Sequence, residues 1–274
     1  MVLVHATEEA AVTPCLLRLA QSKPLIRAVI GWADPTDPSM PRQLDGFMAL
    51  SHKFRGLRMM PAFGDAAPLL GAVALANSRE LASRGLTLDL LLAPSQLPLT
   101  MQLQDRVPGL RFMLNHCGRP LTTTGEVEPW PTALRAVARE TNISCKLSSL
   151  AECAGMDWSL ARPQPFLDVV MDAFKPKRLA FGTNWPVVNL ASFYAGWWAA
   201  LQTMMASYTP SPEARATIFG GTAASFYGPP GMASQSKPDV REPSVRSFGP
   251  AYRSLVDSLM EPPVQFYPLK GFAL

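Results

Sequence analysis

Apolar runs of strand length recur along the chain, and the segments between them are long enough for a helix and two short loops. The runs start about 24 to 35 residues apart. They read VLVHA (2–6), RAVIGWAD (27–34), FRGLRMM (54–60), LTLDLLL (86–92), LRFMLNH (110–116), ISCKLSS (143–149) and RLAFGTN (178–184). Parallel strands that are buried on both faces are apolar almost throughout. The repeat therefore predicts a parallel β-sheet built from strand–helix units.

The same repeat favours a (β/α)8 barrel over an open doubly wound sheet. No glycine-rich phosphate loop of either common type follows any of the runs, which counts against the nucleotide-binding folds. Helices are expected at LLRLAQ, GAVALANSRELASRG, WPTALRAVARET and FLDVVMDAFK. A barrel of this class closes with eight strands. With seven runs and a start almost inside a strand, we expect an α/β barrel that lacks its first β-α unit.

Composition predicts one large domain followed by a tail. The 274 residues are 48% hydrophobic and 17% charged, which is typical of a globular protein with a substantial core. We expect the barrel domain at 1–228, and a linker rich in Pro and Ser with a C-terminal tail at 229–274. The apolar segment VQFYPLKGFAL (264–274) is a candidate to cover the gap in the barrel.

Charge and cysteine content narrow the partners and the compartment. The net charge of +4 is spread along the chain, so a nucleic-acid partner is not expected. Four cysteines without metal-site spacing predict buried free thiols in a reducing compartment. The first residues show no basic leader and no long apolar run, so we do not expect a secretory signal and expect a cytoplasmic protein. The oligomeric state is left open.

One segment is also long enough to be a membrane span. No charged residue occurs between Leu179 and Pro212, and the stretch could cross a bilayer. It contains several polar residues and no closely flanking basic residue. A buried helix of a large α/β domain has the same composition, and we prefer that interpretation.

The carboxyl ends of the strands supply the candidate site, because active sites of parallel α/β barrels lie there. His116 can bind a metal, act as acid or base, or be a structural histidine. Lys146 is unusual within an apolar strand unless it is paired or reaches the barrel rim. Arg58 can clamp a carboxylate or lactone oxygen, or pair with an acid. The full set is His5, Asp34, Arg58, Asp89, His116, Lys146 and Asn184.

Other candidates have simpler interpretations. His52 is expected to be solvated, and Asp34 to be a turn or cap residue. Asp89 lies in mid-strand, and its role is open. No nucleophile elbow, zinc-protease motif or serine-type triad is present, so nucleophilic serine chemistry has no support.

Five ordered segments resemble those of the amidohydrolase-related family. They are VIGWADPTDP, FRGLRMMP, MLNHCGRP, ISCKLSSL and FGTNWPVVNL, and the resemblance covers about residues 2 to 227. Within the family it points to sugar-lactone and pyrone-dicarboxylate lactonases. The resemblance implies a (β/α)8 barrel, a small lactone or carboxylate as substrate, and a divalent metal such as zinc as a cofactor to consider.

The resemblance also implies roles for individual residues. His116 matches the histidine of the family's HxGxP segment. The match implies that His116 is catalytic, and it makes His116 a weak candidate for a metal ligand. Arg58, Lys146 and Trp185 are expected to bind substrate. Asn184 falls where the family has a catalytic aspartate. The family's His-x-His pair has no counterpart, and His5 is the other histidine near a strand end.

These departures predict weakened hydrolysis. Lactone hydrolysis needs an activated water and a stabilised carbonyl oxygen. An amide at Asn184 cannot accept the proton of that water, and general-base catalysis contributes about 10²–10⁴-fold. We therefore expect an amidohydrolase-related lactonase with impaired or lost activity. The alternative is a non-catalytic pseudoenzyme that binds a small carboxylate or sugar acid in the same pocket.

Overall fold

Seven parallel strands form one curled sheet in which each strand pairs with the next along the chain. The computed structural model describes residues 1–120, 128–155, 158–208 and 211–228. All of them belong to the first of two units, 1–236 and 237–274. The strands are β1 (Val2–Val4), β2 (Ala28–Gly31), β3 (Phe54–Met59), β4 (Thr87–Leu90), β5 (Arg111–Leu114), β6 (Ser144–Leu147) and β7 (Leu179–Phe181). Within these described residues, the predicted α/β class and the predicted number of strands, seven, are confirmed.

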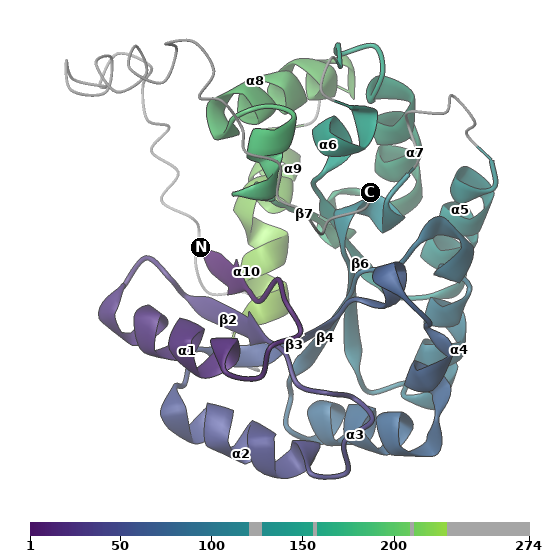
Figure 1. The fold of residues 1–274 in the computed structure, drawn as a ribbon. Helices are drawn as coiled ribbons and strands as arrows, with labels where there is room; N and C mark the ends of the chain where they lie inside the picture. Colours follow the sequence, from purple (N-terminus) through teal and green to yellow (C-terminus); the bar gives the residue numbers. More distant parts are fainter. Residues whose placement is uncertain (121–127, 156–157, 209–210, 229–274) are drawn as a thin grey trace. The chain divides into compact units, whose positions relative to one another are not determined.

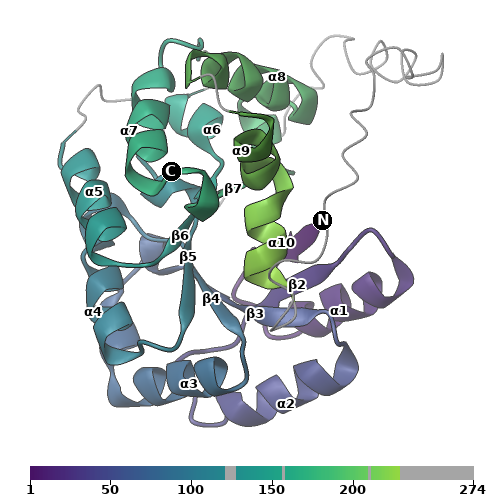
Figure 2. The same cartoon turned by 180° about the vertical axis from the view of Figure 1, so that it is seen from behind.

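Helices connect the strands and cover the outer side of the sheet (Figures 1 and 2). Those predicted at 71–85, 130–141 and 166–175 are present, and the first begins earlier than predicted, at Val12. The helices are α1 (Val12–Ser22), α2 (Met40–Leu50), α3 (Ala72–Ser83), α4 (Leu99–Arg106), α5 (Trp130–Glu140), α6 (Leu150–Ala154), α7 (Gln164–Phe174), α8 (Tyr194–Met205), α9 (Pro212–Ala216) and α10 (Thr222–Tyr227).

The larger core lies between the strands and these helices. In α5, for example, Trp130, Leu134 and Val137 recur at helical spacing and are all buried, so one face of the helix packs inward. Cys117 and Cys145 are buried free thiols, as predicted. Cys15 is exposed, contrary to the prediction, because α1 turns Thr13, Leu17 and Ala20 inward instead.

The charge-free stretch 179–212 is broken into short elements. It contains β7, a 3₁₀ turn (Val187–Leu190) and the 12-residue α8, whose inner face buries Trp197 and Leu201. Within the described part of the chain, no helix is both long and apolar enough to span a bilayer. The apolar character of α8 reflects packing against the rest of the domain.

Helix α10 fills the side of the barrel where the sheet is open. β1 and β7 are the two end strands of the sheet, and α10 packs against β7. Phe226 and Tyr227 of α10 form a second core cluster inside the sheet, together with Ala28, Ile30, Met113 and Ala180. Arg111 Nη1 donates a 2.6 Å hydrogen bond to the Phe226 carbonyl oxygen. The segment expected to cover the gap, 264–274, lies outside the described residues, and within those residues this position belongs to α10.

Replacing Phe226 with Ala should lower the free energy of unfolding by about 3 kcal/mol, because it removes a buried aromatic ring from the inner cluster. The exposed Phe193, 56% accessible, is the matched control, and its replacement with Ala should cost less than about 0.5 kcal/mol. Urea denaturation followed by circular dichroism measures both changes. Equal losses would show that α10 does not help to hold the barrel together.

Candidate active site

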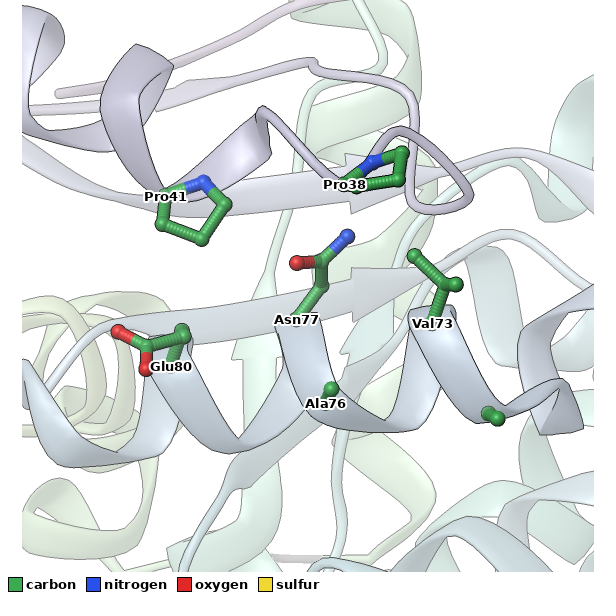
Figure 3. Close-up of a pocket in the computed structure, with 7 residues that line it drawn as sticks. Pro38, Pro41, Val73, Ala76, Asn77 and Glu80 are labelled. Atoms are coloured by element: carbon green, nitrogen blue, oxygen red, sulfur yellow. The ribbon is translucent and has the colours of Figure 1, made fainter.

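An open groove between α2 and α3 lies on the outer helices and carries no reactive group (Figure 3). Asn77 projects into it, but its amide nitrogen donates 2.9 Å hydrogen bonds to the carbonyl oxygens of Pro35 and Asp37. Glu80, at one end, is paired with Arg84 at 3.3 Å. Both polar side chains therefore have structural partners, and the candidate chemistry lies elsewhere.

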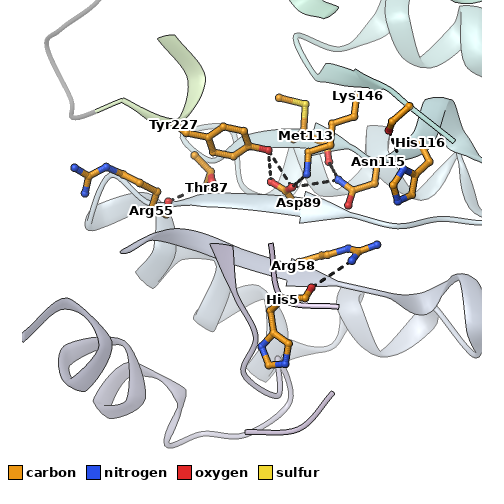
Figure 4. A network of polar contacts seen from close by, with 11 residues as sticks. His5, Arg55, Arg58, Thr87, Asp89, Met113, Asn115, His116, Lys146 and Tyr227 are labelled. Atoms are coloured by element: carbon orange, nitrogen blue, oxygen red, sulfur yellow. Dashed lines mark hydrogen bonds and ion pairs between the residues drawn. The ribbon is translucent and has the colours of Figure 1, made fainter. Parts of the chain in front are cut away.

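The polar centre inside the sheet is built around the Asp89 carboxylate (Figure 4). Asp89 is fully buried on β4 and forms an ion pair with Lys146 of β6. The Tyr227 hydroxyl of α10 lies 3.0 Å from each carboxylate oxygen. Asn115, directly after β5, donates from Nδ2 at 3.2 Å. Four segments that are distant in sequence thus meet at one carboxylate, as a buried charge requires.

Two cations accompany this single carboxylate. Burial lowers the pKa of the Lys146 ammonium and of the Arg58 guanidinium, while Asp89 opposes both changes. Arg58 is only 8% exposed, and its Nη1 donates to the His5 carbonyl oxygen at 3.2 Å. Its buried Nε has no hydrogen-bond acceptor among the described residues. Around Asp89 there is therefore one more cation than carboxylate, and Arg58 Nε is a donor without an acceptor.

His116 lies at the carboxyl end of β5 and is held by Ser148. Its φ of 53° is in the left-handed region, which is uncommon for a residue with a side chain. Its Nδ1 lies 2.8 Å from Ser148 Oγ. Burial lowers the pKa of His116 well below its usual value, and the positive charges of Arg58, Lys146 and Arg119 lower it further. The imidazole is therefore neutral at physiological pH.

Asn184 lies at the end of β7 and also has a left-handed backbone, with φ 52°, which asparagine tolerates better than most residues. Its Nδ2 donates to Glu152 Oε1 at 2.6 Å and to Ser149 Oγ at 3.2 Å. Burial raises the pKa of the Glu152 carboxyl group. Trp185, beside Asn184, is 67% exposed, so its predicted role at the substrate stays a prediction.

The remaining candidates have structural partners or face the solvent. The His5 ring nitrogens lie 2.9 Å from Thr13 Oγ1 and 3.0 Å from Thr7 Oγ1, and the ring points away from Asp89 in Figure 4. Burial lowers the pKa of His5 to about 4. Asp34 forms a turn by accepting from the Thr36 amide at 2.8 Å. His52 is exposed, as predicted.

The side chains present do not fit a divalent metal. Across residues 1–228, apart from the short gaps, no group of three or more His, Cys, Asp or Glu residues is placed to hold one. The charged neighbours that act on His116 are all cations, namely Arg58, Lys146 and Arg119, and they would repel a metal ion. His5, the other candidate ligand, is satisfied by two threonines. These side chains would therefore not hold the divalent metal that the family resemblance implies.

The sequence alone does not identify several contributors to the site. It predicts no role for Tyr227 or Glu152, and it predicts Asn115 and Ser148 only as parts of strands. Asp89 was a candidate without a role, and it is the centre of the network. A carboxylate shortly after the CKLSS segment was a usable signal for Glu152. Tyr227 had none, because its partner is 138 residues away.

Replacing Lys146 with Met should lower the free energy of unfolding by about 3–5 kcal/mol, because Asp89 is left as an unpaired buried charge. A second change, Asp89→Asn, should recover part of this loss. The control is Lys175→Met, at an exposed lysine whose Nζ lies 3.4 Å from Asp172 Oδ1. This change should lower the free energy of unfolding by less than about 1 kcal/mol. Urea denaturation of the four proteins tests the pairing. A small effect of Lys146→Met alone would show that the ion pair is not needed in the core.

Comparison with known proteins identifies the family. The amidohydrolase family model matches residues 4–228. An L-fucono-1,5-lactonase from Burkholderia ambifaria is 33% identical over 218 residues, which cover 78% of this chain and 75% of the relative. The crystal structure of a zinc-bound amidohydrolase from Burkholderia multivorans aligns with a TM-score of 0.77 at 30% identity, covering 84% of this chain and 83% of the other.

A more distant structure supports the fold alone. It is a protein described as a probable 2-pyrone-4,6-dicarboxylic acid hydrolase, from Acinetobacter baumannii, with a TM-score of 0.69 at 16% identity over 83% of this chain and 82% of the other. In the part of the chain that the structure describes, the curled sheet of seven parallel strands is a TIM-barrel-like amidohydrolase fold that lacks one unit. With its residues 4–228 matched throughout, this chain belongs to the amidohydrolase family.

Proposed function

We propose that this chain opens a small lactone, most simply a sugar lactone, by attack of water at the ester carbonyl. The excess positive charge of Arg58 and Lys146 beside the neutral His116 carries this proposal. Attack on an ester places negative charge on the carbonyl oxygen, and fixed cations stabilise that charge strongly when water is excluded. The similarity to an L-fucono-1,5-lactonase supports a sugar lactone as the substrate.

Each polar group has a role in this reaction. The unused Arg58 Nε and the Lys146 ammonium supply donors for substrate oxygens. The neutral His116 ring, held at Nδ1 by Ser148, presents its other nitrogen to the carbonyl. Trp185 is proposed to cover the substrate from the rim. Asn184 orients neighbouring groups but takes no proton, because an amide has no basic site near neutral pH.

Ligand binding without turnover is the second candidate function. The amide at Asn184 favours it, since the family resemblance expects a catalytic aspartate there. The cationic interior would then hold a small carboxylate or sugar acid, such as the product of lactone opening. A higher melting temperature of the protein in the presence of sugar acids, together with no turnover of lactones, would support this function.

We also propose a reducing, cytoplasmic setting for this small-molecule chemistry. Cys15, Cys117 and Cys145 are free thiols. Such cysteine usage is typical of proteins kept in reducing compartments.

The proposal predicts that Arg58→Met lowers kcat/KM for sugar 1,5-lactones by about 10²–10³-fold, as loss of one oxyanion donor does in other enzymes. Turnover is measured by acid release in a pH-stat, with spontaneous ring opening subtracted. Arg55→Met is the matched control, because Arg55 lies on the same strand and donates to backbone carbonyl oxygens. It should change kcat/KM less than about threefold. Equal effects of the two changes would contradict a role for Arg58 at the substrate.

A further inference from the structure

Glu152 and Asn184 form a carboxylate–amide pair at the carboxyl end of the sheet. Glu152 lies on α6, which follows β6, and Asn184 follows β7. The two side chains are joined by the 2.6 Å contact from Asn184 Nδ2 to Glu152 Oε1. Asn184 Nδ2 makes a second contact, to Ser149 Oγ. The hydrogen bonds between Asn184 and other described side chains therefore all come from its amide nitrogen, which suits a carboxylate acceptor.

This pairing explains why residue 184 is an amide. An aspartate at the same position would bring two carboxylates to within hydrogen-bond distance. Two such groups repel each other and share one proton. The amide removes that conflict and donates to Glu152 instead. The carboxylate of this region is thus on residue 152, while residue 184 holds it in place.

The second carboxylate oxygen of Glu152, Oε2, is the atom of the pair that is left to bind a ligand. Glu152 Oε2 is buried and has no hydrogen-bond donor among the described residues. A buried acceptor without a donor destabilises the fold, and such a group in a native structure often marks a functional site. A carboxylate oxygen has only acceptor capacity when ionised. A water or substrate hydroxyl is the donor that would complete it.

Short contacts connect this pair to His116. Ser148, whose Oγ lies 2.8 Å from His116 Nδ1, immediately precedes Ser149. Gly182, at the end of β7, packs so closely on Ser148 that an added methyl group would lie 3.1 Å from its Cβ. His116 and Asn184 therefore follow the strands β5 and β7, and Glu152 lies on α6, which follows the strand β6 between them. The consecutive residues Ser148 and Ser149 join the contacts of His116 to those of Asn184.

We propose that Glu152 is the general base of this site and that Asn184 is its positioning residue. The inference rests on the proposed lactone hydrolysis. In the first step, an O–H bond of water breaks and the proton passes to Glu152, while the water oxygen bonds to the carbonyl carbon and the C=O π electron pair moves to the carbonyl oxygen. In the second step, that pair re-forms the C=O bond, the ring C–O bond breaks with its electrons on the leaving oxygen, and this oxygen takes the proton back from Glu152. The products are a hydroxy acid and an unchanged enzyme.

The surroundings of Glu152 favour this use. Burial raises the pKa of its carboxyl group, which makes the carboxylate a better proton acceptor. Burial raises the pKa of the neighbouring Cys153 thiol to about 12, and the positive charge of Arg119 opposes this change. The 3₁₀ turn Val187–Leu190, which packs against α6, contributes no titratable side chain. Protonation of Glu152 is therefore expected to contribute an acid limb to the activity profile, and Glu152→Gln removes that contribution.

The decisive variants are Glu152→Gln and the exchange E152Q/N184D. Glu152→Gln should lower kcat for a sugar 1,5-lactone by about 10²–10⁴-fold with little change in KM. It should also abolish the fall in activity of the wild-type protein at low pH. The exchange returns the carboxylate to residue 184 and the amide to residue 152, so it should recover much of the lost kcat. Glu140→Gln, at an exposed position on α5, is the control and should leave kcat unchanged.

Thermal unfolding separates catalysis from folding in the same variants. The raised pKa means that the ionised Glu152 destabilises the fold as pH rises through its folded-state pKa, so Glu152→Gln should be at least as stable as wild type at pH 8. Unchanged kcat in a folded Glu152→Gln protein would overturn the role of Glu152 and leave lactone hydrolysis standing. Turnover by the exchange variant but not by wild type would also overturn it. Absence of turnover in both proteins would overturn the inference and the proposed function together.

Discussion

The burial of one carboxylate, Asp89, organises the interior of this domain. Its charge cannot remain in an apolar environment without partners, and those partners come from β6, from the end of β5 and from α10. The contact with Tyr227 matters most for the architecture, because it fastens α10 into the open side of the sheet. A helix thus occupies the place where the sheet lacks a strand. Hydrophobic packing alone would position it less specifically, since apolar contact has no direction.

The same carboxylate leaves a charge imbalance that bears on function. Asp89 balances one of two buried cations, and Arg58 keeps a donor without an acceptor. His116 responds to the same field, because nearby positive charges add to the effect of burial in lowering its pKa. An interior of this kind disfavours a metal cation and favours groups that gain negative charge. One electrostatic arrangement therefore accounts for the poor fit to a metal and for the proposed stabilisation of an ester oxygen.

Much of the fold was predictable from sequence, because parallel strands buried on both faces produce apolar runs at a regular interval. All seven runs contain a strand. The pairing of Lys146 was foreseeable in kind, since a lysine in such a run needs a partner, but its partner was not identified. The contacts Asp89–Tyr227 and Glu152–Asn184 join residues 138 and 32 positions apart. Such contacts depend on how helices return to the sheet, which periodicity does not encode.

The Asn184–Glu152 pair changes the meaning of the amide in the family's aspartate position. Read along the chain, the amide indicates a lost base. Seen in three dimensions, it is one half of a pair in which the carboxylate belongs to the neighbouring β-α connection. Catalysis depends on where an acceptor oxygen lies relative to the reacting atoms, not on which strand supplies it. A substitution in a motif is therefore evidence of lost activity only when no neighbouring side chain brings the same chemical group to the same place.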